Sequence, residues 1–401
     1  MIRKPYFASR LFKTGSLAAG ASAAALVLLS LAARPAVAET KTYVVSWFVL
    51  AAFLEEGNCP AGLNPDTETF FRRDLAAIGM APEKIEAVMT ARAGAIVAGS
   101  SSAADAAMAA DALIYRGRAN GKPTHAYNYP GTVPDAHINT IESKFAYGFN
   151  LDGKGAASPN SFEDPVTHEK GVNNEYFRAV GCHGPERPSP NDPYQTMWAY
   201  AWHNLQQSLP AWIISVTGDD LSKDGAVTVT FDKAMEHVDV DVNVKVMADK
   251  TFRIDPDPRW HNEYRATLKN GEITTNEPSR FRMLYDSYWV PEFDLTRARL
   301  RLTMKPDGSL DGILGGYEKW RALYFAYASF GINAEDQAGL DVPGTYHALK
   351  RLADAEPDPK TGENTRISAA FRIEAVPAFA VPLRAATGRS PRGAQFSQSE
   401  K

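Results

Sequence analysis

The segment from Phe149 to Cys182 holds the residue types best suited to chemistry in this chain. It reads FNLDGKGAASPNSFEDPVTHEKGVNNEYFRAVGC. Hard cations such as Ca²⁺ bind about six to eight oxygen atoms, which Asp, Glu and Asn side chains and backbone carbonyls supply. Glycines at 153, 155 and 171 permit the tight turns that would aim carbonyls inward. We therefore predict a structural calcium site formed by oxygen-bearing side chains of this loop: Asn150, Asp152, Asp164, Asn173, Asn174 and Glu175.

An ordinary turn-rich loop is the alternative to a calcium site. Asp, Asn and Gly are the residues that build turns, and a long loop collects them for that reason alone. The segment also departs from the EF-hand pattern. Counted from Asn150, the glycine falls at the fourth position (Gly153) and the twelfth residue is Ser161 in place of Glu.

The same segment resembles one found in uncharacterised exported bacterial proteins. Four short motifs carry the resemblance, in the order LDG, DP, GV[DN]N and GC. In this chain they are Leu151-Asp152-Gly153, Asp164-Pro165, Gly171-Val172-Asn173-Asn174 and Gly181-Cys182. The resemblance covers about 35 residues and implies no known activity.

Residues 1–38 predict export from the cytoplasm. Basic residues at positions 3, 4, 10 and 13 precede an apolar run, 17–33, and the small-x-small pattern Ala36-Val37-Ala38 follows. This is the organisation of a secretory signal peptide. The alternative is an uncleaved membrane anchor, for which the apolar run is short. We expect a periplasmic or secreted protein.

The chain has two cysteines, Cys59 and Cys182. Exported proteins meet an oxidising environment, so an even number of cysteines predicts a disulfide. Two buried free thiols are the alternative. The haem-attachment pattern C-x-x-C-H is absent from the sequence, so we expect no haem.

Composition narrows the classes of partner. Removal of residues 1–38 leaves 38 basic and 47 acidic residues, a net charge near −9. Nucleic-acid binding proteins carry a basic patch or stripe, so we expect no nucleic acid partner. We also expect no stable membrane insertion after signal cleavage. The partner is an unknown ligand or protein.

Catalytic motifs are missing from the sequence. There is no G-x-S-x-G, no P-loop and no G-x-G-x-x-G, so we expect no nucleotide cofactor. Acid pairs that could hydrolyse a glycoside occur at Glu55-Glu56, Asp219-Asp220 and Asp255/Asp257. Adjacent acids usually face water, however. We expect a non-catalytic binding or structural protein, and the alternative is a hydrolase acting on polysaccharide or ester substrates through a carboxylate pair.

Aromatic residues supply a further candidate site. Trp198 and Trp202 are spaced to lie on one helix face, where they could stack on sugar rings. The alternative is that they pack a helix onto a sheet, because large aromatic side chains mostly lie in cores.

The secondary-structure elements that position these residues divide into an N-terminal helical part and a later strand-rich part. Helices are predicted over 66–78, 82–97 and 102–115, the last beginning at a capping box, Ser102 to Asp105. From 211 onward, short runs rich in Val, Ile and Thr predict strands. The expected fold is α+β, an N-terminal helical part followed by an antiparallel β-sandwich. The expected divisions are a signal peptide (1–38), a strand plus helical part (39–148), the oxygen-rich loop (149–182), a sandwich-like domain with C-terminal helices (183–383) and a disordered tail (384–401).

Overall fold

The structure is a computed structural model that describes residues 38–96, 102–159, 161–187, 209–284 and 292–382. The chain divides into two units, residues 1–38 and 39–401. Three predictions lie outside the described residues. They are the signal peptide except for Ala38, the stacking pair Trp198 and Trp202, and the tail 384–401.

The helices of the described residues are α1 (Thr67–Ala77), α2 (Pro82–Ile96), α3 (Ala103–Ile114), α4 (Glu175–Val180), α6 (Trp320–Ala328), α7 (Ile332–Asp336) and α8 (Val342–Leu352). Short 3₁₀ turns are η1 (Pro130–Thr132), η2 (Gly155–Ala157), η3 (Gly184–Glu186) and η4 (Pro258–Trp260).

The strands up to the middle of the chain are β1 (Glu39–Leu50), β2 (Gly117–Ala119), β3 (Lys122–Thr124), β4 (Phe162–Glu163), β5 (Lys170–Val172), β6 (Pro210–Gly218) and β7 (Gly225–His237). The later strands are β8 (Lys250–Ile254), β9 (His261–Lys269), β10 (Glu272–Thr275), β11 (Ser279–Met283), β12 (Phe293–Met304), β13 (Leu310–Lys319), β14 (Ala355–Pro357) and β15 (Asn364–Pro382).

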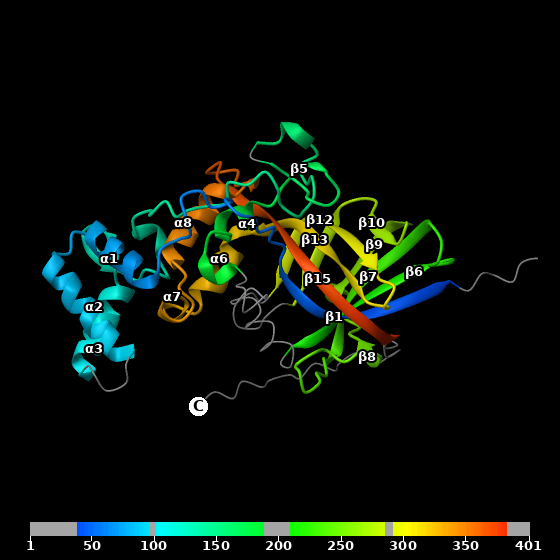
Figure 1. The fold of residues 1–401 in the computed structure, drawn as a ribbon, viewed down its shortest axis with the longest axis horizontal. Coiled ribbons are helices and arrows are strands. Elements are labelled where there is room, and N and C mark those ends of the chain that lie inside the picture. Colours follow the sequence, from blue (N-terminus) through cyan, green and yellow to red (C-terminus); the bar gives the residue numbers. More distant parts are fainter. Residues whose placement is uncertain (1–37, 97–101, 160, 188–208, 285–291, 383–401) are drawn as a thin grey trace, which may run out of the picture. The chain divides into compact units, whose positions relative to one another are not determined.

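Eight of these strands form a closed antiparallel barrel. Hydrogen-bonded neighbours follow the order β1, β6, β7, β9, β10, β12, β13, β15, and β15 pairs again with β1. Figure 1 shows the first strand, in blue, beside the last, in red. The predicted α+β fold with a β-sandwich is therefore wrong. The protein is mostly β and its helices are few and mostly short.

Strand patterns cannot separate a sandwich from a barrel. Both need short antiparallel strands with one apolar face, so the same alternation of residues predicts either one. The two folds differ in whether the edge strands meet. Here Tyr43 pairs with Pro377 and Leu50 with Phe371, residues more than 300 positions apart. The first strand, β1, thus joins the sheet formed by the later strands, between β6 and β15.

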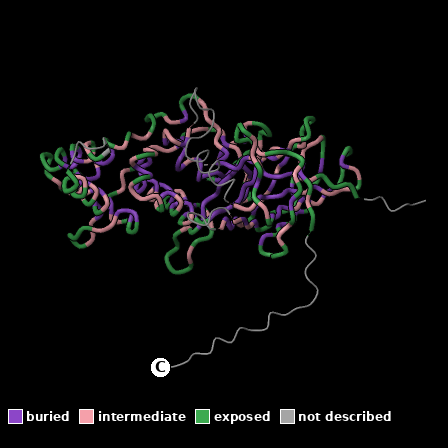
Figure 2. The backbone as a smooth tube through the Cα atoms, turned by 90° about the horizontal axis from the view of Figure 1, so that it is seen from below, coloured by how far each residue is buried: buried purple, intermediate pink, exposed green. Residues whose placement is uncertain are grey.

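The barrel interior is filled by apolar side chains. Phe48 stacks on Phe371 with ring centroids 5.1 Å apart, and Phe293 meets Phe371 edge-on at 5.1 Å. Aliphatic side chains of the other strands complete this core, which is the buried region on the right in Figure 2. An eight-stranded barrel has an interior just wide enough for side chains to fill. With the interior filled, the outer face of the barrel is the surface open to a ligand.

The oxygen-rich loop, Phe149–Cys182, packs on the outside of β13 and β15. Phe149 and Leu151 share a small apolar cluster with Ile313 and Ala370, which point outward from those strands. Gly315 makes this approach possible, because a Cβ at that position would lie 2.6 Å from the Phe149 ring. The loop is thus seated on the barrel.

The disulfide predicted between Cys59 and Cys182 is confirmed. The two Cα atoms lie 5.9 Å apart, and the bridge closes a loop with a sequence separation of 123 residues. In the chain-entropy model, a loop of this length stabilises the fold by about 5 kcal/mol. The bridge ties the segment that follows β1 to the end of the oxygen-rich loop.

Helices α1, α2 and α3 confirm the three helices predicted from sequence. Phe70, Phe71 and Leu75 of α1 pack with Val88 of α2 and Leu113 of α3. Caps begin two of these helices. The Asp66 carboxylate accepts the Thr69 N–H at 2.8 Å, and the Ser102 hydroxyl accepts the Asp105 N–H at 3.1 Å.

A buried ion network joins α1 to α7. Arg116 is fully buried and donates to Asp74 of α1 at 3.0 Å and to Glu335 of α7 at 2.6 Å. Tyr127 donates to the second Glu335 oxygen at 2.6 Å. Burial raises the pKa of Glu335 to about 7, although Arg116 and Tyr127 act to lower it. The Arg116 guanidinium compensates the buried Glu335, and it shares Asp74 with Arg73, which lies 2.8 Å from that carboxylate.

We predict that Arg116→Met lowers the free energy of unfolding by about 3–5 kcal/mol, because it leaves the buried Glu335 without its cation, while Asp74 keeps Arg73. Urea unfolding followed by circular dichroism measures the change. The control is Arg72→Met, which removes an exposed ion pair with Glu68 and Glu86 and should have a much smaller effect. Equal losses for both variants would contradict the prediction.

Candidate binding groove

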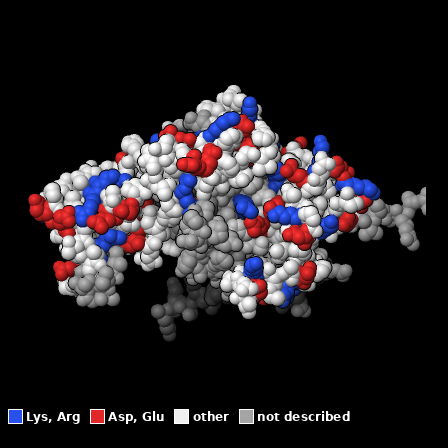
Figure 3. Space-filling view, viewed as in Figure 1, with Lys and Arg blue, Asp and Glu red and all other residues white. Residues whose placement is uncertain are grey.

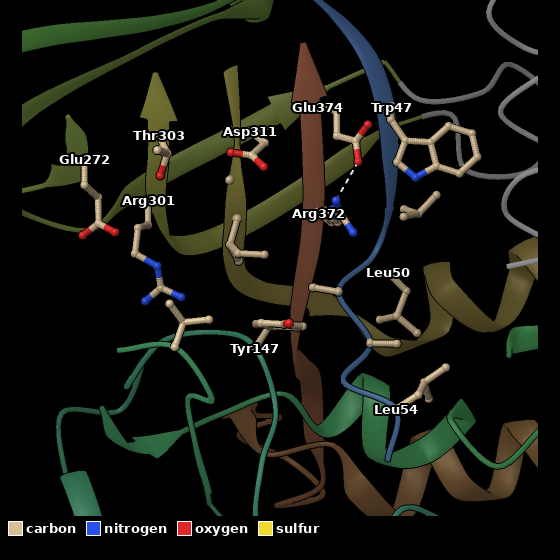
Figure 4. Close-up of a pocket in the computed structure, with 16 residues that line it drawn as sticks. Trp47, Leu50, Leu54, Tyr147, Glu272, Arg301, Thr303, Asp311, Arg372 and Glu374 are labelled. Carbon is tan, nitrogen blue, oxygen red and sulfur yellow. Dashed lines mark ion pairs between the residues drawn. The ribbon is translucent and has the colours of Figure 1, made fainter. Parts of the chain in front are cut away.

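A groove with a volume of about 630 Å³ lies on the outer face of the barrel (Figure 4). Strands β10, β12, β13, β15 and β1 form its floor. Val166 of the oxygen-rich loop, Tyr147 just before that loop and residues of the chain after β1 border it. This volume is in the range of ligand sites, about 300–1,000 Å³. Its labelled side chains in Figure 4 are Trp47, Leu50, Leu54, Tyr147, Glu272, Arg301, Thr303, Asp311, Arg372 and Glu374.

Strand register places one row of polar side chains across the groove. Glu272 pairs with Thr303, Thr303 with Asp311, and Asp311 with Glu374. The row ends at Trp47 of β1, which is also opposite Glu374. Because residues directly opposite one another point to the same face, four strands contribute neighbouring polar groups and a fifth contributes an indole.

Two carboxylates of this row are direct cross-strand neighbours. Directly opposite Cβ atoms are about 4.5–5.5 Å apart, and like charges at that spacing destabilise a sheet. Each of the two acids has a cation. Lys305 lies 2.7 Å from Asp311, and Arg372 lies 2.8 Å from Glu374. A sheet selected for stability alone has no need of this Asp311–Glu374 pair, which marks it as a candidate for function.

The next row along the strands carries two arginines. Arg301 is opposite Ile313, and Ile313 is opposite Arg372. Arg301 reaches out of the sheet to the buried Asp164 of the oxygen-rich loop, with a separation of 2.6 Å. This ion pair attaches the loop to the strand beside the groove.

Asp164 is held in its ionised form. Burial acts to raise the pKa of this carboxyl, but the N–H of Thr167, Arg301 and the N–H of Val166 outweigh burial and lower the pKa. Its first oxygen accepts both N–H groups at 2.9 Å, and its second faces Arg301. Asp164 therefore attaches the oxygen-rich loop to the barrel through its ion pair with Arg301.

The other side of the groove is apolar. Leu54 and Ile313 contribute apolar surface together with the ring of Tyr147, whereas the side chain of Leu50 is fully buried beneath it. A ligand that fits this surface has hydroxyl or other polar groups on one edge and C–H groups on a face. Carbohydrate rings have this character, since their hydroxyls can donate to carboxylates and accept from Arg while their C–H faces pack on apolar side chains.

Two of the six predicted calcium ligands, Asp152 and Asn173, are joined through Ser158. Ser158 donates to Asp152 at 2.8 Å and accepts from Asn173 at 3.1 Å. Asn173 also accepts the Leu151 N–H, and Asn150 accepts the Gly155 N–H. Hydrogen bonds from Lys154 and Ser158 lower the pKa of Asp152 against the opposing effect of its partial burial.

The remaining predicted ligands have other partners. Asp164 faces Arg301, as described above. Asn174 is the N-cap of α4, and its side chain accepts the Phe177 N–H. Glu175 lies 2.8 Å from Arg178, and burial raises its pKa to about 7. Among the described residues, no three His, Cys, Asp or Glu side chains are grouped to hold a metal ion. Calcium binding by the six stays a prediction.

The acid pairs singled out in the sequence lie outside the groove lining. Asp255 pairs with Lys233, Asp220 pairs with Lys223, and Glu55 accepts from Ser143. The acids that do line the groove come from three different strands, β10, β13 and β15. No local spacing brings them together, so only knowledge of the strand register could have found them.

Charged side chains of both signs are interspersed over the described part of the face shown in Figure 3. Within the described residues, no helix combines the length and apolar character needed to cross a membrane.

No protein-family model, curated protein or solved structure matches this chain.

We predict that Ca²⁺ raises the melting temperature and that a chelator reverses the rise, because a cation would hold the oxygen-rich loop in place. Calorimetric titration and thermal unfolding measure both effects. Asp152→Asn should weaken the response, and Asp307→Asn, in the turn between β12 and β13, is the control. Absence of both heat and a temperature shift in the unaltered protein would contradict a calcium site.

Proposed function

We propose that this is an exported, non-catalytic binding protein that holds a carbohydrate chain in the groove. The observation that carries the proposal is the row Glu272, Thr303, Asp311 and Glu374, which ends at Trp47 and faces an apolar wall. Export rests on residues 1–38, and the disulfide between Cys59 and Cys182 is compatible with an oxidising compartment. The proposal includes a structural calcium ion bound by the oxygen-rich loop, which borders the groove at Val166.

The barrel suits this role physically. Its strands fix the spacing of the polar row, because each side chain stands on a hydrogen-bonded ladder with an apolar core beneath it. Groups held in place before binding lose little conformational freedom when a ligand arrives. The same argument applies to the bordering loop, which the Arg301–Asp164 pair and the disulfide attach at two points.

We predict that Asp311→Asn weakens binding of a linear oligosaccharide about tenfold or more, because it removes a charged hydrogen-bond acceptor at the centre of the row. Isothermal titration with cellohexaose, chitohexaose and maltohexaose measures this. The control is Asp239→Asn, which alters an exposed Asp that pairs with Lys250 away from the groove. If none of the three sugars binds, or if both variants bind alike, the carbohydrate proposal fails.

A hydrolase is the second candidate, and the cross-strand pair of Asp311 and Glu374 favours it. Glycosidases use two carboxyl groups, one to protonate the leaving oxygen and one to attack or to activate water. Retaining enzymes place these groups about 5–5.5 Å apart. The Cβ atoms of directly opposite residues are about 4.5–5.5 Å apart, so side-chain rotation can bring the carboxyl groups of Asp311 and Glu374 to a separation of this order.

We predict for this candidate that the protein releases reducing ends from a polysaccharide and that Glu374→Gln abolishes release while leaving the protein folded. Reducing-sugar assays on cellulose, chitin and starch measure the activity. Glu363→Gln is the control, since Glu363 pairs with Lys350 at the surface. Sugar binding without release of reducing ends would decide in favour of the binding protein.

A further inference from the structure

A second cleft, with a volume of about 380 Å³, lies where η4, β11, β12, β13 and α6 meet. It shares no lining residue with the groove described above. Four cations line it, namely Arg259, Arg280, Arg282 and Lys319. Arg259 comes from η4, and Arg280 and Arg282 come from alternate positions of β11. Lys319 is the N-cap of α6.

Three carboxyl groups share this cleft with the cations. Arg280 binds both oxygens of Asp294, at 2.5 and 2.8 Å, and Arg259 binds Glu292. The third acid, Glu318, is fully buried and accepts the N–H groups of Asp294 and Lys319. Cations therefore outnumber acids in the cleft, and the most deeply buried acid already has two donors.

The carboxyl groups differ in ionisation. Burial raises the pKa of Glu318 to about 7, against the N–H groups that act to lower it. Burial acts in the same direction on Asp294, but hydrogen bonds from Arg280 and Arg366 outweigh it and hold the pKa of Asp294 well below its usual value. Near neutral pH the cleft thus carries more positive charge than a count of its acids indicates.

Two of the cations have donors that are not used within the described residues. The Nε of Arg282 is buried and makes no hydrogen bond, with Glu292 and Asp294 at 3.5 and 3.8 Å. The Nζ of Lys319 is 3.6 Å from Asp294, beyond normal hydrogen-bond distance. The Lys319 ammonium therefore faces the cleft with bonding capacity left over, and the buried Nε of Arg282 is an unsatisfied donor in its wall.

Helix α6 adds to the positive character. Lys319 is its N-cap and makes no side-chain cap, and Ala322 of its first turns lines the cleft. The N-terminus of a helix favours negative charge. Cations from η4, β11 and α6 together present donors from several directions, which suits a tetrahedral oxyanion better than a planar carboxylate.

We propose that this cleft is a second binding site, which takes a phosphate or sulfate group through Arg282, Lys319 and the exposed edges of Arg259 and Arg280. The group is either a free ion or an ester on a larger molecule.

The test is thermal unfolding and isothermal titration with sodium phosphate, sodium sulfate and glucose 6-phosphate, each compared with sodium chloride at equal ionic strength. We expect saturable binding of the oxyanions and a higher melting temperature. Tighter binding of glucose 6-phosphate than of phosphate indicates an ester ligand, and the reverse indicates a free ion. A response no larger than that to chloride overturns the proposal.

The variant Arg282→Gln with Lys319→Gln should weaken phosphate binding at least tenfold. Lys319→Gln alone keeps the protein testable, because this side chain is 58% exposed, and it should weaken binding to a smaller extent. The matched control is Arg253→Gln with Lys250→Gln on β8, where both cations have surface partners. If the paired substitutions and the control bind phosphate equally, the site is not where we place it.

Discussion

Pairing of β15 with both β1 and β13 is the constraint on which the rest of the structure depends. The last strand fills the gap between the first strand and β13, and this closes the barrel. Closure removes the two sheet edges and encloses the Phe48, Phe293 and Phe371 core. It also sets the register that places Asp311, Glu374 and Trp47 side by side on the outer face. Interior packing and surface chemistry thus follow from one set of hydrogen bonds.

The oxygen-rich loop depends on the barrel in turn. Phe149 lies against Gly315, Asp164 is paired with Arg301, and the disulfide fixes the end of the loop at Cys182. These three attachments differ in kind, since one is apolar contact, one is a buried ion pair and one is covalent. A loop held in this way has little conformational freedom before binding. It therefore loses little conformational entropy when a ligand occupies the groove beside it. Some of its polar side chains also hydrogen-bond to the backbone of its own turns, as Asn173 does to Leu151 and Asn150 to Gly155.

Several features could be predicted because their causes are local. The helices at 67–77, 82–96 and 103–114 follow from caps and helix-forming residues. The disulfide follows from there being only two cysteines to pair. The groove had no such signature. Glu272, Asp311 and Glu374 are separated in sequence by tens of residues, and each one alone reads as an ordinary surface acid.

The sequence by itself determined which segments are helices and strands, which cysteines pair and which loop is rich in oxygen ligands, because neighbouring residues or simple counting decide these properties. Only the tertiary structure decided that the sheet closes as a barrel and not as a sandwich, since that depends on whether β1 and β15 meet across more than 300 residues. It also decided that Asp164 faces Arg301 and that three distant acids share a groove. Register in a sheet is a long-range property, and a shift of one residue would send the whole polar row to the other face.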